Sequence, residues 1–218
     1  MLTPPAGGAR MLPMTKMEDI VCPPPEAGML FDAAEAFGSA GLFELEIGCG
    51  KGGFLLRRAQ AHSEVRLLGI EWASKYSKYA ADRMARWGVG NVRVMRTDGR
   101  HFVMHHLPAV SLSALHVYHP DPWPKKRHHK RRLFQPAFVA AATRALAPGG
   151  RWAIQTDHAE YFAWIEEMLG GADGLVPVDY DDAAFGIVDS AAQTNFEVKY
   201  AREGRQFHRL AFRKRGEG

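Results

Sequence analysis

An aspartate held between two prolines stands beside the densest group of cations in the chain. Residues 119–132 read HPDPWPKKRHHKRR, with Asp121 near the start. Six of the last eight residues are cationic, namely Lys125, Lys126, Arg127, Lys130, Arg131 and Arg132. The formal net charge of the 218-residue chain is +4, so without these six cations it would be −2. Such local basicity indicates a phosphate-rich partner, and the adjoining carboxylate suggests chemistry on that partner; the alternative is a solvated loop.

Three further acids stand at the ends of predicted strands. Glu46 ends a strand at 42–47, Glu71 follows an apolar run at 65–70, and Asp98 follows a strand at 91–96. Asp121 itself follows a fourth strand, at 112–118. In a parallel α/β sheet ligands bind beyond the carboxyl ends of the strands, so we expect these four acids around one pocket.

The glycine turn after the first strand distinguishes between adenosine cofactors. Gly48, Gly50 and Gly52 give a G-x-G-x-G pattern, whereas a dinucleotide site has G-x-G-x-x-G. Glu46 would repel a pyrophosphate but would suit the ammonium group of S-adenosylmethionine. Glu71 is then placed to accept hydrogen bonds from the ribose hydroxyls, and Asp98 from the adenine amino group. The alternative is a generic tight turn with surface acids.

The elements that must position these residues alternate along the chain. Strands are predicted at 42–47, 65–70, 91–96, 112–118 and 151–155, and helices at 54–59, 74–87 and 131–146. This alternation predicts an α/β fold with a doubly wound, Rossmann-like, mostly parallel sheet. Two further strands, at 197–201 and 206–212, are separated only by a short turn. They predict a C-terminal antiparallel hairpin.

The bulk properties predict one globular domain. Residues 1–28 are rich in proline and glycine and predict an extended or disordered arm, whereas residues 29–218 form a single domain that begins with a short helix at 29–37. The two cysteines have no metal-ligand spacing. The sequence contains no signal peptide and no membrane-spanning run, so the expected location is the cytoplasm.

Several motifs together resemble a known family, the tRNA (guanine-N7-)-methyltransferases of the bacterial single-subunit kind. They are LEIGCGKGGF, LLGIEW, NVRVMRTDGR, PDPWPKKRHHKRR, the LAPGG turn, QTD and TNFE. The resemblance implies a class I methyltransferase that uses S-adenosylmethionine to form N7-methylguanosine in tRNA, at position 46 of the variable loop. It also implies no obligate protein partner, in a monomer or a homodimer.

The resemblance also implies roles for individual residues. Asp121 would be catalytic, and the cofactor would be bound by Glu46, Gly48, Gly50, Glu71, Asp98 and Asp121. The substrate would be bound by Lys125, Asp157, Thr194, Asn195, Phe196 and Glu197. The RNA would lie along Arg127, His128, His129, Lys130, Arg131 and Arg132. The sequence departs from the family at His119, where an aromatic or apolar residue is usual, and in the polar last strand FHRLAF.

Alternatives remain open at several of these positions. Trp123 can stack on a base or pack beneath its loop. Asp157 can be a strand-end cap, and Thr194 and Glu197 can be ordinary edge-strand residues. Two rival functions also remain. One is a methyltransferase of the same fold that acts on another RNA, a protein or a small molecule, and the other is an RNA-binding module that has lost catalysis.

Overall fold

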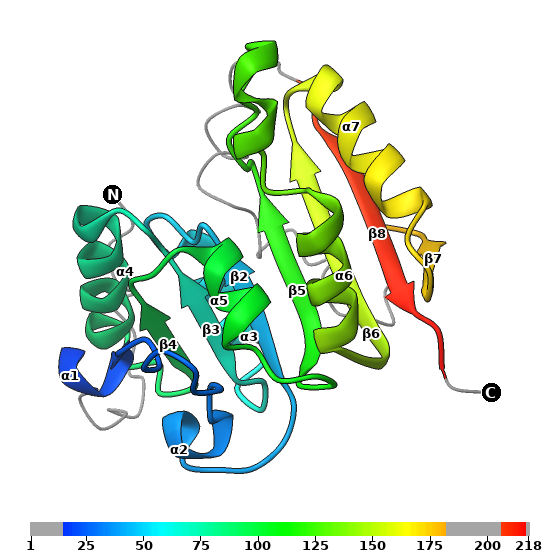
Figure 1. Ribbon diagram of the computed structural model, residues 1–218. Helices are drawn as coiled ribbons and strands as arrows, with labels where there is room; N and C mark the ends of the chain where they lie inside the picture. Colours follow the sequence, from blue (N-terminus) through cyan, green and yellow to red (C-terminus); the bar gives the residue numbers. More distant parts are fainter. Residues whose placement is uncertain (1–14, 182–205, 217–218) are drawn as a thin grey trace.

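An eight-stranded sheet forms the centre of the computed structural model, which describes residues 15–181 and 206–216 (Figure 1). The strands lie in the order β1-β4-β3-β2-β5-β6-β8-β7. Their bounds are β1 Val21–Cys22, β2 Phe43–Ile47, β3 Leu67–Ile70, β4 Val92–Met95, β5 Leu112–Tyr118, β6 Leu146–Thr156, β7 Leu175–Val178 and β8 His208–Lys214. The helices are α1 Met17–Ile20, α2 Ala33–Phe37, α3 Gly53–Ala61, α4 Ser74–Arg86, α5 Gly99–His105, α6 Pro136–Ala145 and α7 Ala159–Gly170.

The strand order reverses beside β2, where the functional cleft is expected. From β2 the chain proceeds outward to β3 and β4, and then returns to place β5 on the other side of β2. β4, β3, β2, β5 and β6 are parallel to one another, so their carboxyl ends meet at one edge. This switch point is where α/β folds bind ligands. The predicted doubly wound, mostly parallel sheet is confirmed.

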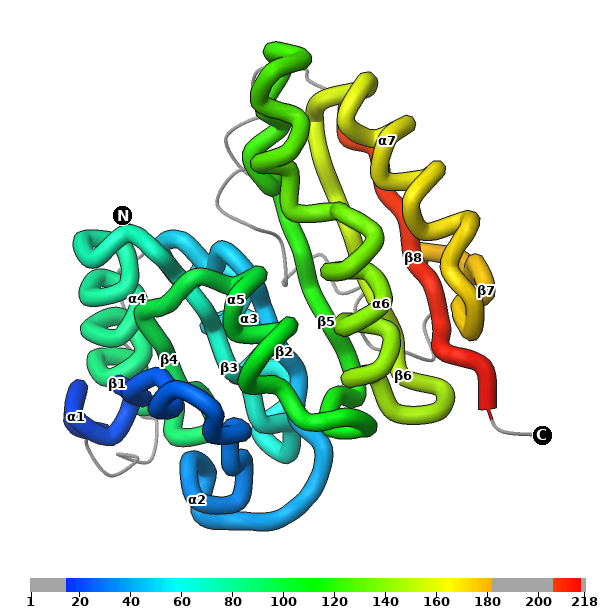
Figure 2. The backbone as a smooth tube through the Cα atoms, in the orientation of Figure 1, coloured from blue at the N-terminus to red at the C-terminus, as the bar shows by residue number. Residues whose placement is uncertain are grey.

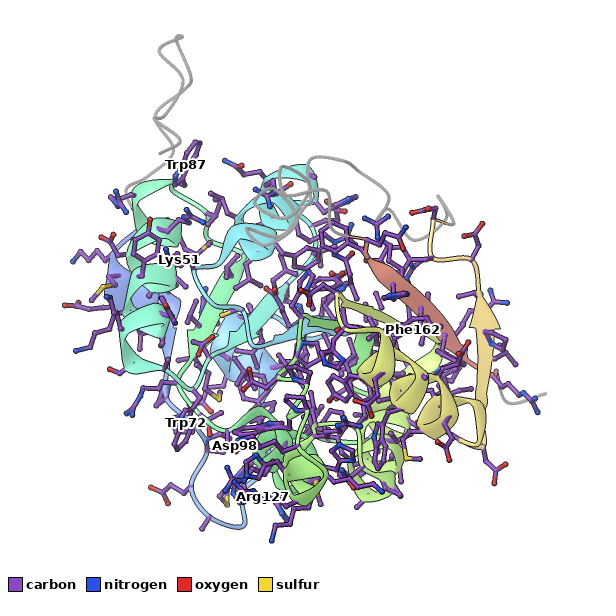
Figure 3. All side chains as sticks on the ribbon, turned by 90° about the horizontal axis from the view of Figure 1, so that it is seen from above. Lys51, Trp72, Trp87, Asp98, Arg127 and Phe162 are labelled. Carbon is purple, nitrogen blue, oxygen red and sulfur yellow. The ribbon has the colours of Figure 1, made fainter. Side chains whose placement is uncertain are left out.

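Helices cover both faces of the sheet, and each face has its own hydrophobic cluster. Helices α5, α6 and α7 pack on one face, against side chains such as Leu115 and Trp152. Helices α3 and α4 pack on the other face, against Leu67, Val92 and Val94. Figure 3, which looks down on the carboxyl ends of the strands, shows α3 and α7 on opposite sides of the sheet.

The N-terminal part of the chain is more ordered than we predicted. An arm was expected over residues 1–28, but Met17–Ile20 form a helical turn and β1 pairs in parallel with β4. The Ile20 side chain is fully buried in the α3–α4 cluster, and this burial fixes the segment on the sheet edge. Residues 1–14 lie outside the described part. The helix predicted at 29–37 begins only at Ala33, where Asp32 caps it.

The antiparallel edge is formed differently from the predicted hairpin. The strand expected at 206–212 is β8, and it lies between β6 and β7, antiparallel to both (Figure 2). Its partner β7 was not predicted, because Pro177 interrupts a short run. The other predicted strand, at 197–201, lies outside the described residues.

The helix predicted at 131–146 is divided. Lys126–Arg131 form a 3₁₀ helix, and α6 begins at Pro136, a residue suited to the first helical turn. α5 and α7 were not predicted as helices. In the described part of the chain, no helix is long and apolar enough to cross a membrane.

Candidate active site

A cleft of about 520 Å³ opens at the carboxyl ends of the central strands. It contains five of the predicted cofactor-binding residues, namely Gly48, Gly50, Glu71, Asp98 and Asp121. Trp123 and Arg131 from the proline-flanked, basic segment line the same cleft. The structure therefore places three of the four expected cofactor acids, together with Trp123 and Arg131 of the basic segment, around one opening.

The glycine turn after β2 is shaped by its backbone. Gly48 and Gly50 have φ angles of 77° and 54°, in the left-handed region that glycine adopts without steric cost. The Gly48 amide donates to the Ile70 carbonyl oxygen at 2.8 Å, which ties the turn to the end of β3. The turn thus presents backbone without Cβ atoms to the cleft, as a closely approaching ligand requires.

The Glu71 carboxylate is held by the backbone on both sides. Its Oε2 accepts the Gly50 N–H at 2.9 Å, and its Oε1 accepts the Ala73 N–H at 2.8 Å. Each oxygen keeps a second lone pair, so the carboxylate can still accept hydrogen bonds from a diol in the cleft. Asp98 is fixed similarly, because its Oδ1 caps α5 by accepting the His101 N–H at 2.8 Å.

Glu46 lies beneath the cleft and does not line it. Glu46 is only 3% exposed, and its Oε2 has no hydrogen-bond partner among the described residues. Burial, with a smaller contribution from the charge of Glu71, raises the pKa of Glu46 to about 8. A buried carboxyl oxygen without a hydrogen-bond partner is costly, and an ammonium group bound at the glycine turn would favour the charged form of Glu46. This site fits the cationic amino-acid end of S-adenosylmethionine.

The loop that carries Asp121 has a strained backbone on both sides of the acid. His119 and Trp123 have φ angles of 51° and 44°, which are unusual for residues with a Cβ. Asp121 is exposed at the cleft and accepts no hydrogen bond from the described residues. The neighbouring strands and prolines therefore fix a carboxylate that has no hydrogen-bond partner in residues 15–181 and 206–216.

Trp123 both packs on its loop and faces the cleft. The His128 ring meets it edge-to-face at 5.8 Å between centroids, and the Arg131 guanidinium lies 5.0 Å from the ring centroid. The packing alternative for Trp123 is thus supported by two contacts, while its half-buried ring still lines the cleft.

The cations of this segment differ in burial, and the burial of Arg132 contradicts our prediction that this residue contacts the RNA. Arg132 is 0% exposed, so it does not lie along a bound RNA. Its Nε donates to the Pro122 carbonyl oxygen at 3.0 Å, and its Nη2 contacts Glu160 Oε2 at 2.6 Å. The guanidinium also lies 5.0 Å from the ring centroids of both Tyr161 and Trp164. Arg132 is therefore an internal residue whose contacts hold the Asp121 loop against α7.

The remaining residues of the segment lie at the surface. The exposed cations are Lys125, Lys126, Arg127, Lys130 and Arg131. His128 and His129 are half-buried, and His129 packs edge-to-face on Trp164 at 5.7 Å. The 3₁₀ helix and the preceding Lys125 therefore present five cations outward around a partly packed histidine pair.

Several residues of the site were not identified from the sequence. Trp72, Tyr76 and Arg100 line the cleft, and Arg100 Nη2 donates to the Arg131 carbonyl oxygen at 3.2 Å and also to that of Arg132. This contact joins α5 to the basic segment. Only Trp72 carried a signal in the sequence, because it directly follows Glu71.

Asp157 lies close to His119, which lines the cleft. Arg209 Nε donates a hydrogen bond to Gln155 Oε1 at 2.9 Å, and arginine can only donate, so this atom of Gln155 is the oxygen. The Gln155 amide nitrogen therefore faces His119 Nε2, at 3.1 Å. The His119 proton then belongs on Nδ1, which lies 3.7 Å from Asp157 Oδ1. Asp157 does not line the cleft itself. The predicted substrate residues Thr194, Asn195, Phe196 and Glu197 lie outside the described residues.

Comparison with known proteins agrees with this architecture. Residues 41–210 match a family model described as "Putative methyltransferase". A tRNA (guanine-N(7)-)-methyltransferase of Geobacter metallireducens is 34% identical over 94% of this chain and 99% of its own length. The chain belongs to the tRNA (guanine-N7-)-methyltransferase family. A second member of this family, from Alkalilimnicola ehrlichii, is 38% identical over 88% of this chain and 80% of its own. The predicted resemblance is confirmed.

Solved structures share the fold at low sequence identity. TrmN from Thermus thermophilus superposes with a TM-score of 0.55 at 16% identity, covering 83% of this chain and 46% of its own. The [4+2]-cyclase SpnF gives 0.54 at 20% identity, covering 84% and 78%. Because one of the two is named as a cyclase, the fold by itself does not select the reaction of this family member.

Proposed function

We propose that this protein transfers the methyl group of S-adenosylmethionine to N7 of a guanine in tRNA, forming N7-methylguanosine, and that the target is position 46 of the variable loop. Membership of the tRNA (guanine-N7-)-methyltransferase family supports the reaction. The observation that carries it is the single cleft in which Glu71, Asp98 and Asp121 meet the basic segment.

The cofactor would be held by residues that the structure already fixes. Glu71 would accept hydrogen bonds from the ribose hydroxyls, Asp98 would accept one from the adenine amino group, and Glu46 would face the ammonium group. When bound, S-adenosylmethionine supplies an electrophilic methyl group on a sulfonium. Gly48 and Gly50 would let that end of the molecule lie against the backbone.

Asp121 would orient the guanine and stabilise its growing charge. Guanine N7 already carries an in-plane lone pair, so the protein needs no general base to activate it. What it must supply is alignment of N7 with the methyl group, together with tolerance of positive charge on the base. A carboxylate that has no competing partner among the described residues can accept hydrogen bonds from guanine N1–H and the exocyclic amine.

The RNA would lie across the exposed side of the basic segment. Lys125, Arg127, Lys130 and Arg131 are placed to contact phosphates, with His128 and His129 between them. A role for Asp157 in substrate binding is supported by its connection to the cleft through His119. The substrate roles of Thr194, Asn195, Phe196 and Glu197 stay predictions.

Assembly and location also stay predictions. We propose that the enzyme acts as a monomer or homodimer in the cytoplasm without an obligate protein partner. Support for this comes from the cleft, which a single chain forms from β2, β3, β4 and β5. Light scattering of the purified protein would give its mass in solution.

Product identification tests the reaction directly. Unmodified tRNA transcript is incubated with S-adenosylmethionine carrying a labelled methyl group, digested to nucleosides and separated. We expect the label in N7-methylguanosine, and a transcript with position 46 changed should lose it. Label in another nucleoside, or none with a folded protein that binds the cofactor, would rule out the proposal.

The Asp121→Ala variant tests the proposed catalytic residue. The rate of methyl transfer at saturating substrates should fall at least about 100-fold, because the variant loses the group that orients and stabilises the base. Binding of tRNA, measured by fluorescence anisotropy, should change little. Asp173→Asn, which removes an acid distant from the cleft, should keep the wild-type rate. Near-normal turnover of Asp121→Ala would remove Asp121 from the mechanism.

A further inference from the structure

One outward surface of the protein combines exposed aromatic rings with cations. Of the aromatic side chains in residues 15–181 and 206–216, only three are more than 40% exposed: Trp72 at 68%, Tyr76 at 42% and Tyr79 at 41%. All three lie on or directly before the first half of α4. Large aromatic side chains are normally buried, so a group of three on one surface indicates a binding function.

Cations lie over two of these three rings. The Arg96 guanidinium is 6.0 Å from the Trp72 ring centroid, and Arg83 is 5.3 Å from that of Tyr79. Lys51, from the glycine turn, places its Nζ 5.8 Å from the Tyr79 centroid. Rings flanked by cations can stack on bases while their neighbours contact phosphates.

The charge of this surface is mainly positive. We define the α4 face as Lys51, Trp72, Lys75, Tyr76, Lys78, Tyr79, Arg83 and Arg96. It contains five cations and no acid. The nearest acid along α4, Asp82, is paired with Arg86 at 2.7 Å. Glu18 and Asp19 belong to α1, which lies beside the far end of α4 in Figure 1. The face therefore suits a polyanion.

The α4 face is continuous with the active-site cleft. Trp72 and Tyr76 belong to it and also line the cleft. In the view down on the cleft, Asp98 lies between Trp72 and Arg127 of the basic segment, and Lys51 lies farther along the α4 side (Figure 3). Both borders of the cleft thus carry a tryptophan with an arginine over its ring, Trp72 with Arg96 and Trp123 with Arg131.

We propose that the α4 face is a second RNA-binding surface, which holds an unpaired stretch of the substrate RNA by stacking bases on its tyrosines and contacting phosphates with its lysines and arginines. The substrate RNA would then extend across both borders of the cleft. This inference rests on the proposed function, because it takes tRNA as the RNA that binds. It assigns binding residues outside the segment 119–132.

Tyr79 and Lys78 provide the test, because neither lines the cleft. The dissociation constant for tRNA is measured by fluorescence anisotropy over a series of salt concentrations. Tyr79→Ala should weaken binding about tenfold, and Tyr79→Phe, which keeps a ring for stacking, should bind like the wild type. Lys78→Gln should weaken binding and lower the slope of log affinity against log salt by about one.

Two controls make the result specific. Arg213→Gln removes one exposed charge from β8, on the other half of the sheet, and should leave tRNA affinity within about twofold. Calorimetry with S-adenosylmethionine should give wild-type affinity for all four variants, which also shows that they fold. Unchanged tRNA affinity in Tyr79→Ala would overturn the proposal, as would an equal loss in Arg213→Gln. A loss confined to cofactor affinity would overturn it too.

The test also separates this inference from the proposed reaction. If the labelled nucleoside is not N7-methylguanosine but the α4 variants lose RNA affinity, the surface stands and the reaction fails. If the reaction is correct and the variants bind tRNA normally, only the surface fails.

Discussion

In β2, β5 and β6 the two faces of the central sheet carry opposite kinds of side chain. On the face covered by α5, α6 and α7, the strands present Phe43, Leu45, Leu115, Val117 and Trp152 to an apolar cluster. On the other face the same strands carry polar side chains that are also buried, namely Glu44, Glu46, His116, Tyr118, Arg151 and Gln155. Because successive residues of a strand point to opposite faces, the same strands serve two environments.

Part of the polar face forms a hydrogen-bonded network that leads to the cleft. Glu44 contacts Arg58 of α3 at 2.7 and 3.1 Å, and His116 Nε2 lies 3.0 Å from Glu44 Oε2. His116 Nδ1 accepts from the Tyr118 hydroxyl at 3.0 Å, and Tyr118 lines the cleft. The apolar face stabilises the fold by burying hydrophobic side chains. The polar face instead connects a buried ion pair by hydrogen bonds to the strand ends that carry the site. This difference predicts that the two faces respond differently to substitution.

The largest effect is expected from Glu44→Ala. Arg58 is only 4% exposed, and the substitution removes the carboxylate that its guanidinium contacts. Removing one partner of a buried ion pair costs about 4 kcal/mol of the free energy of unfolding. Urea denaturation followed by circular dichroism measures this loss. A loss below about 1 kcal/mol would show that the polar network contributes little to stability.

Acid should destabilise the wild type through the same network. Burial alone would raise the pKa of Glu44, but hydrogen bonds from His116 and Arg58 outweigh it and lower the pKa to about 2. Burial also lowers the pKa of His116. A lowered folded-state pKa gives stability that is lost as the pH falls, here about 3 kcal/mol between pH 4.5 and 2 for Glu44. In Glu44→Ala this part of the acid transition should be missing from urea titrations at each pH.

Glu46→Gln should act in the opposite direction on stability. The pKa of Glu46 is raised to about 8 in the folded protein. Between pH 4.5 and 8 this carboxyl is therefore ionised in the unfolded chain but protonated in the folded protein, which favours the unfolded state. Gln cannot ionise, so the variant should be about 3 kcal/mol more stable at pH 7. Thermal unfolding measures this gain.

The same substitution should weaken cofactor binding. An ammonium group near Glu46 favours the carboxylate, so wild-type affinity for S-adenosylmethionine should rise with pH up to about 8. Calorimetry should show lower affinity and no such rise in Glu46→Gln. Wild-type binding by the variant at every pH would place the ammonium group elsewhere.

The smallest effect is expected on the apolar face. Ile165 of α7 is fully buried there, and Ile165→Val removes one methylene from a packed cluster. The free energy of unfolding should fall by about 1 kcal/mol, and the rate of methyl transfer should not change. An altered rate would mean that the apolar face also positions the site.

The sequence alone determined the fold class and the centre of the site. The period of apolar residues located β2 to β6, and the glycine turn with the acids at 46, 71, 98 and 121 predicted a ligand at the carboxyl edge. These features are local, because strand alternation, glycine turns and strand-end acids each appear within a few consecutive residues. The N-terminal arm was misjudged because its composition is that of a loop, while the burial of Ile20 depends on α4.

Only the tertiary structure decided which charges face solvent and which are internal. Arg132 and Arg131 are neighbours of the same type, yet one is enclosed by Tyr161, Trp164 and Glu160 while the other lies over Trp123 at the cleft. Glu44 and Glu46 likewise share a strand face, but Glu44 is hydrogen-bonded to Arg58 and His116 from other elements, whereas Glu46 Oε2 has no hydrogen-bond partner among the described residues. The pairing of β8 with β7 and the aromatic surface of α4 arise in the same way. The β8–β7 pairing and the placement of Lys51 and Arg96 over the α4 rings depend on contacts between residues far apart in the chain, and no local pattern encodes such contacts.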